Sequence, residues 1–179
     1  MDRNILFAFS YNMPINKEKI LKNISLILLD KGLKLSICES CTGGLISKIC
    51  TDYKGSSAWF TGGVVSYSNS LKEIIGVKKS TLIDNGAVSE NTAKEMSLAV
   101  LNFTKSDVCL SVTCIAGPTG WTKEKPVGSV YFSFVDKNGF YQKYKYLFKG
   151  SRDDIRRSAA EQGIQIILDC MLSLIHIWR

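Results

Sequence analysis

The hydrophobic positions of this chain follow two spacings, one typical of helices and one typical of strands. Intervals of three and four residues predict helices at residues 16–31, 45–52, 69–75, 90–103 and 151–170. Intervals of two, or short β-branched and aromatic runs, predict strands at residues 33–38, 64–67, 108–115, 128–135 and 140–148. Because helices alternate with strands and the last two strands form a hairpin, we expect one α/β domain. Its predicted architecture is a three-layer α/β/α sandwich with a mixed β-sheet.

Polar residues and glycines mark where several of these elements begin and end. Asn16 and Ser89 occupy N-cap positions of two predicted helices, and Gly32 fits the position just past the end of the first. Asn138-Gly139 supplies the positive φ angles of a tight hairpin turn. A polar, glycine-rich cluster at residues 39–44 directly follows the first predicted strand. We therefore expect it at the carboxyl end of the sheet, where open α/β folds bind ligands.

We divide the chain into an N-terminal extension (1–15), one domain (16–171) and a tail (172–179). The tail is either the end of the last helix or adapter-derived sequence that does not belong to the gene. No uncharged apolar run reaches the roughly 18 residues that span a bilayer, and no clear signal peptide is present. We therefore expect a cytoplasmic protein without a membrane partner.

The chain carries 23 lysines and arginines against 16 aspartates and glutamates, a formal net charge of +7. This excess favours an anionic partner, either a phosphorylated small molecule or nucleic acid, although it also suits an ordinary soluble surface. The lysines and tyrosines of residues 143–146 alternate on opposite faces of a predicted strand, so they form no aromatic platform for bases. We expect no nucleic-acid partner.

Cysteine and histidine usage narrows the chemistry further. The six cysteines are expected to be reduced thiols, and we favour buried strand thiols over a zinc site built on Cys38, Cys41, Cys109 and Cys114. The chain has one histidine, His176, to which we assign no role, so a serine–histidine–acid triad is not expected. We expect no metal and no cofactor.

Ser40 is the first candidate for a reactive group, because it lies at a strand-to-helix turn that can point its hydroxyl into a crevice. Thr42, Gly43 and Gly44 follow it, and backbone amides in such a turn can stabilise a phosphate or a developing oxyanion. The alternative is a polar cap on a glycine-rich turn. Because no role is assigned to His176, the remaining base for a serine nucleophile is a lysine of lowered pKa.

Lys72 is the candidate base, because it lies in the helix that begins near Asn69, just after the strand that ends at Tyr67. Tyr67 could relay a proton or orient the lysine. The alternatives are a solvated helix lysine and a core aromatic residue.

Several motifs in sequence order resemble the C-terminal domain of the competence-damage-inducible CinA family. They are residues 39–44 (ESCTGG), 55–60 (GSSAWF), 62–69 (GGVVSYSN), 86–89 (GAVS), 115–118 (IAGP) and 124–128 (EKPVG). The resemblance covers about residues 17–171. Stand-alone members of that family are nicotinamide-nucleotide amidases, so it implies hydrolysis of nicotinamide mononucleotide to nicotinate mononucleotide and ammonia. A non-catalytic nucleotide-binding module with a decayed site is the alternative.

The resemblance also implies roles for individual residues. Ser40 would be the nucleophile, Lys72 the base and Tyr67 the bridge between them, with backbone amides near Thr42 and Gly43 holding the oxyanion. The residues expected to bind substrate are Thr42, Gly43, Gly44, Asn69, Thr113, Gly117, Lys125, Arg152 and Arg156, the last three as candidates for the phosphate.

Two positions depart from the family pattern. Cys114 stands where glycine is usual, and Trp121 stands in a loop where a small residue is usual. Both are expected near the nucleotide pocket, where they could alter substrate preference or activity. We also expect a homo-oligomer.

Overall fold

The computed structural model describes residues 16–177, and their side chains as far as Ile175. The predicted N-terminal extension and residues 178–179 lie outside the described residues. None of the helices in the described part has the length and apolar character needed to cross a membrane.

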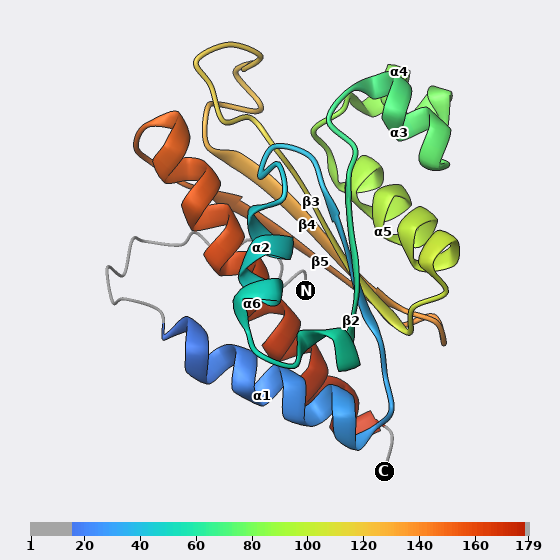
Figure 1. Cartoon of the computed structure of the whole chain (residues 1–179). Coiled ribbons are helices and arrows are strands. Elements are labelled where there is room, and N and C mark those ends of the chain that lie inside the picture. The colour runs from blue at the N-terminus through green and yellow to red at the C-terminus, as the bar shows by residue number, and fades with distance from the viewer. Residues whose placement is uncertain (1–15, 178–179) are drawn as a thin grey trace.

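A five-stranded mixed sheet forms the middle layer (Figure 1). Its strands are β1 (Leu35–Glu39), β2 (Phe60–Val65), β3 (Val108–Cys114), β4 (Ser129–Asp136) and β5 (Tyr141–Leu147). Their order across the sheet is β2-β1-β3-β4-β5. β1 pairs in parallel with β2 and β3, while β4 runs antiparallel to both β3 and β5. The carboxyl ends of β1, β2 and β3 therefore meet at one edge of the sheet.

Helices cover both faces of this sheet, so the predicted three-layer sandwich is confirmed (Figure 1). One outer layer holds α1 (Lys17–Asp30), α2 (Leu45–Asp52) and α6 (Arg152–Ile177). The other holds α3 (Asn69–Ile75), α4 (Lys79–Asn85) and α5 (Glu90–Thr104). The larger hydrophobic core lies between the sheet and α6, and a smaller one lies under α5.

The two faces of the central strands differ in chemistry. Leu35 and Ile37 of β1 pack into the larger core, whereas Ser36 faces the other way and its hydroxyl lies 2.6 Å from that of Ser106. Under α5 the hydroxyl of Ser111 donates to the carbonyl of Ala93 at 2.5 Å. These polar strand positions are buried, and their small hydroxyl side chains let α5 lie close to the sheet.

The structure corrects the bounds of two predicted elements and adds two elements that the sequence analysis missed. The second strand is Phe60–Val65 rather than residues 64–67, and Ser66 and Tyr67 lie beyond its end. The sequence analysis missed α4 and a short 3-10 helix at Ser56–Ala58. The last helix continues past residue 170 to Ile177, and Leu174 packs into the larger core, so residues 172–177 are helical.

Candidate active site

Ser40 is placed at the carboxyl edge of the sheet by the strand that precedes it. It follows the last residue of β1, and its amide donates to the carbonyl of Val112 in β3 at 3.0 Å, which extends the parallel ladder by one bond. The chain then turns sharply into α2 through Gly43 and Gly44, whose φ angles are +62° and +97°. These positive φ values favour glycine, because a Cβ atom is strained there.

Lys72 comes from the opposite helical layer and meets Ser40 directly. Its Nζ lies 3.0 Å from Ser40 Oγ, 2.6 Å from the carbonyl oxygen of Ser66 and 3.2 Å from that of Tyr67. The Lys72 side chain is buried, with 1% of its surface exposed, and Ser40 is 7% exposed. The predicted contact between serine and lysine is therefore present without any bridging group.

Burial also sets the charge preference of this amine. Desolvation lowers the pKa of Lys72, an effect partly offset by the neighbouring Cys38. Burial raises the pKa of the Cys38 thiol to about 11, and its Sγ lies 3.5 Å from the hydroxyl of Ser66. The amine thus lies beside a neutral thiol and carbonyl oxygens, and it loses its proton at a lower pH than a solvated lysine does.

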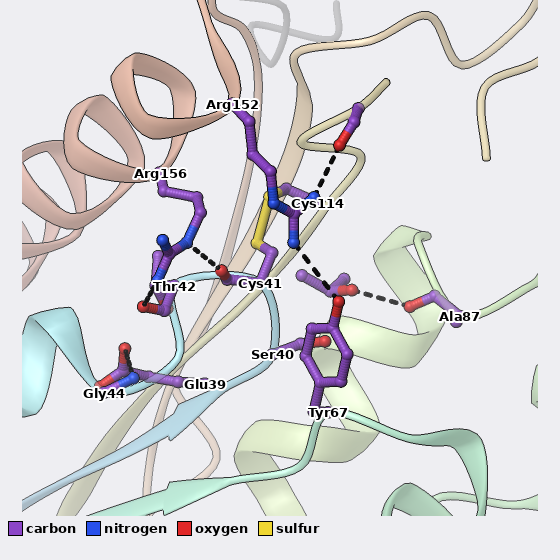
Figure 2. The surroundings of a disulfide bond; sticks show 12 residues. Glu39, Ser40, Cys41, Thr42, Gly44, Tyr67, Ala87, Cys114, Arg152 and Arg156 are labelled. Carbon is purple, nitrogen blue, oxygen red and sulfur yellow. Dashed lines mark hydrogen bonds between the residues drawn. A yellow bond between two sulfur atoms is a disulfide. The ribbon is translucent and has the colours of Figure 1, made fainter. Parts of the chain in front are cut away.

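The position of Tyr67 corrects the expectation that it bridges Ser40 and Lys72. Its ring is 63% exposed, and its hydroxyl lies 3.4 Å from Nη2 of Arg152 (Figure 2). It is the backbone carbonyl of Tyr67 that meets the lysine amine. The side chain forms part of the pocket wall instead.

Glu39 is a residue of the site that the sequence analysis missed. Its fully buried carboxylate accepts hydrogen bonds from the amides of Gly44 (2.9 Å), Ile46 (3.2 Å) and Ser47 (2.8 Å), and from the Ser47 hydroxyl (2.6 Å). The carboxylate thereby caps the N-terminus of α2 and ties the turn after Ser40 to that helix. Its position directly before the serine, at a helix start, was the available signal.

The structure also corrects which backbone amides of the turn after Ser40 are free to hold an oxyanion. The Gly43 amide donates to the carbonyl of Ser40 at 3.2 Å, and the Gly44 amide is held by Glu39. In the part of the chain that the structure describes, the amides of Cys41 and Thr42 donate to no protein acceptor. Thr42 is fully buried, backbone included, and its hydroxyl has no partner among the described residues.

Cys41 and Cys114 form a disulfide bond, which overturns the expectation of six reduced thiols (Figure 2). Their Cα atoms are 5.7 Å apart, and the bond joins the residue after Ser40 to the last residue of β3. The other four cysteines are free and buried, as expected. No cluster of three or more possible metal ligands occurs within the described residues.

A pocket of about 510 Å³ opens above Ser40 and Lys72. Its volume is within the range of small-molecule sites, roughly 300–1,000 Å³. The predicted site residues that line it are Ser40, Tyr67, Lys72, Thr113, Gly117, Lys125 and Arg152. No carboxylate of the described residues lines it, so its charged groups are cationic.

Two cations on the pocket wall are held by backbone carbonyls. Arg152 donates to the carbonyl of Gly117 at 2.7 Å, and Lys125 donates to that of Asn85 at 2.7 Å. Each keeps further N–H groups beyond these bonds, so both remain candidates to bind an anion.

The structure places Asn69, Thr42, Gly43, Gly44 and Arg156 outside the pocket lining. For Arg156, the reason is visible in Figure 2: the guanidinium donates to the carbonyls of Cys41 at 2.9 Å and Thr42 at 3.1 Å. It holds the turn after Ser40 from the side of α6 rather than facing the pocket.

Comparison with known proteins places this arrangement in a family. Residues 17–171 match the model described as the CinA C-terminal domain. The chain belongs to the CinA C-terminal domain family.

Relatives within this family carry names that bear on function. The nicotinamide-nucleotide amidohydrolase PncC of Enterobacter agglomerans is 49% identical over 146 residues, covering 81% of this chain and 89% of that protein. The PncC protein of Escherichia coli (strain K12) is 43% identical, covering 76% of this chain and 84% of that protein. A CinA-like protein of Leptospira borgpetersenii is 46% identical over 84% of this chain, but the match spans 36% of that longer protein.

Solved structures of CinA-family proteins share the fold. A competence/damage-inducible protein from Agrobacterium tumefaciens has a TM-score of 0.83 and 34% identity, covering 92% of this chain and 97% of that one. A CinA superfamily protein from Enterobacter cloacae has a TM-score of 0.84 and 28% identity, covering 94% and 99%.

The two departures from the CinA family pattern have different surroundings. Cys114 is in the pocket wall and forms the disulfide with Cys41. Trp121 is 59% exposed and lies outside the pocket lining, although Gly120 and Thr122 on either side of it belong to that lining. Only Cys114 thus touches the candidate site directly.

Proposed function

We propose that this chain hydrolyses the carboxamide of nicotinamide mononucleotide, giving nicotinate mononucleotide and ammonia. The observation that carries the proposal is the buried amine of Lys72, 3.0 Å from the hydroxyl oxygen of Ser40 at the base of a cationic pocket. The names of relatives at 43–49% identity supply the substrate class.

The active form of the site has Lys72 uncharged, and burial favours this form because it lowers the pKa of the amine. In this form its two N–H bonds donate to the carbonyls of Ser66 and Tyr67, so the lone pair is free to accept from Ser40 Oγ, 3.0 Å away. The Ser40 hydroxyl then donates its proton to that lone pair. This arrangement gives the serine a base without a histidine.

Attack begins when Ser40 Oγ adds to the carboxamide carbon as its proton passes to Lys72. The amides of Cys41 and Thr42 donate to no protein acceptor in the described residues. Cys41 lines the pocket, whereas Thr42 is buried outside its lining, so the Cys41 amide is our candidate for the oxyanion site. Removing one such donor typically costs about 100–1,000-fold in rate. Arg156 and Glu39 act as positioning residues, because they fix the backbone that carries this amide.

Collapse of the tetrahedral intermediate breaks the carbon–nitrogen bond. The Lys72 ammonium returns its proton to the departing nitrogen, and ammonia leaves an ester on Ser40. Water then attacks the ester with Lys72 again as base, which releases the carboxylate product and restores the serine. The ring and ribose occupy the pocket, and Arg152 with Lys125 binds the phosphate at its wall.

Ammonia release tests this proposal most economically. Wild-type protein should release ammonia from nicotinamide mononucleotide, with a lower kcat/KM for nicotinamide riboside, which lacks the phosphate. Saturable binding of the mononucleotide without ammonia would identify the alternative, a nucleotide-binding module, and would overturn the enzymatic proposal. Equal kcat/KM for the two compounds would remove the phosphate role of Arg152 and Lys125.

A further inference from the structure

The Cys41–Cys114 disulfide is built into the wall of the candidate active site. It joins two residues that are 73 positions apart in the sequence, and the first of them, Cys41, directly follows Ser40 (Figure 2). Cys41 and Cys114 are 6% and 8% exposed, and both line the pocket that also holds Ser40 and Lys72. A small molecule that enters this pocket can therefore reach the bond.

The remaining cysteines of the described chain are poor partners for exchange. Cys38, Cys50, Cys109 and Cys170 are buried, and burial raises the pKa of each thiol, to about 11 for Cys38 and about 12 for Cys170. Since the thiolate is the reactive form, these four thiols are inert at neutral pH. Thiol–disulfide chemistry is thus confined to the pair in the pocket wall.

We propose that the Cys41–Cys114 pair is a reversible redox-modification site that controls the activity of the serine beside it. Its reaction partner is a small dithiol. One thiolate of the dithiol attacks a sulfur of the pair, which forms a mixed disulfide and releases the other cysteine as a thiolate. The second thiol of the reagent then displaces the first cysteine. The protein gains two electrons and two protons, so the disulfide becomes two thiols, and the reagent, which loses them, leaves as its own disulfide.

The effect on the site follows from packing. Reduction converts two bonded sulfurs into two non-bonded atoms, and non-bonded heavy atoms pack about 3.5–4.0 Å apart. The backbone on either side is tied down: the Ser40 amide to Val112, the Cys41 carbonyl to Arg156, and the Ile115 amide to Ser129. The added separation must therefore be taken up by the pocket wall or by the turn at Cys41 and Thr42.

The oxidised protein is accordingly the more active form. This inference rests on the proposed function, because the turn at Cys41 and Thr42 carries the proposed oxyanion donor, the Cys41 amide. A misplacement of 1 Å near reacting atoms can cost about 100-fold in rate. We expect reduction to lower kcat/KM by at least about 5-fold, within that limit.

The test compares the full chain before and after treatment with dithiothreitol. Alkylation under denaturing conditions, followed by peptide mass spectrometry, reports which cysteines are paired. Hydrogen exchange of the peptide spanning residues 40–47 reports the mobility of the turn, and ammonia release reports activity. Cys114→Ala removes the pair, and Cys170→Ala is the matched control at a buried cysteine outside the pocket.

We expect two protected cysteines, Cys41 and Cys114, in untreated wild type and none after reduction. Reduction should speed exchange in residues 40–47 and lower kcat/KM, and reoxidation should restore both. Cys170→Ala should respond to the dithiol as wild type does, and Cys114→Ala should not respond.

Alkylation of all six cysteines without reductant would overturn the inference, as would freed thiols with unchanged kcat/KM. If neither redox form releases ammonia, the proposed function fails. The redox site is then judged by exchange alone, and unchanged exchange after reduction overturns it.

Discussion

Combining substitutions at Ser40 and Lys72 tests whether the two residues act as one catalytic unit. Ser40→Ala removes the hydroxyl, and Lys72→Met removes the amine while keeping a side chain of similar length. A general base is typically worth about 100–10,000-fold. That range corresponds to about 2.7–5.4 kcal/mol at 1.36 kcal/mol per tenfold change in rate.

The structure fixes how these losses combine. Because Lys72 Nζ lies 3.0 Å from Ser40 Oγ, each group acts through the same hydrogen bond. Either single substitution should therefore lower kcat by about 100–10,000-fold, and the double variant should be no slower than the slower single variant. Two independent groups would instead multiply their losses, giving about 10⁴–10⁸-fold.

The assay is ammonia release from nicotinamide mononucleotide by the wild type, both single variants and the double variant. Lys48→Met is a matched control, because Lys48 lies on the exposed face of α2 and pairs with Asp52; it should keep activity within about 2-fold. Unfolding curves must accompany the rates, since Lys72→Met leaves the Ser66 and Tyr67 carbonyls without their buried donor, at about 1–3 kcal/mol for each. The reasoning would be refuted if the decreases in kcat of the two single variants multiplied in a folded double variant, or if Lys72→Met kept the wild-type kcat.

Three other outcomes are expected. Burial lowers the pKa of Lys72, so kcat/KM should rise with pH as the amine loses its proton, with a midpoint below the ordinary value of 10.5; a profile that falls over this range would contradict the base role. Arg152→Ala and Lys125→Ala should raise KM for the mononucleotide by about 10-fold or more with little change in kcat, and an unchanged KM in steady-state kinetics would exclude both from phosphate binding. Glu39→Ala leaves four donors at the start of α2 without their acceptor, one buried and three half-buried, so denaturant unfolding should show a free energy of unfolding lower by at least about 3 kcal/mol with an unchanged m-value; a decrease below about 1 kcal/mol would remove its capping role.

The sequence predicted the layered architecture well because its signals are local. The side chains of Asn16 and Ser89 accept hydrogen bonds from the amides of Lys19 and Thr92, as N-cap residues do. Both helices begin directly after these predicted caps. Strand β2 was misplaced because Gly62 and Gly63 carry no strand signal. A Cβ at Gly63 would lie 1.9 Å from the Ser47 hydroxyl, so close packing against α2 requires glycine there.

The site was predictable only in part, because its remaining members depend on tertiary contacts. The structure brings Ser40 and Lys72 together as their motifs predicted. The disulfide between Cys41 and Cys114 depends on the parallel pairing of β1 with β3, which sequence spacing does not reveal. Arg156 is a second example, since its turn-holding role arises from the way α6 crosses the start of α2.

The central claim is that the Lys72 amine beside Ser40 has a lower pKa than an ordinary lysine. NMR titration of protein carrying ¹³C-labelled lysine measures this directly and needs no activity, with Lys72→Arg identifying the Lys72 signal by its absence. The account predicts that Lys72 titrates below 10.5, separately from the exposed lysines. A Lys72 signal that titrates at or above 10.5, together with the exposed lysines, would contradict it.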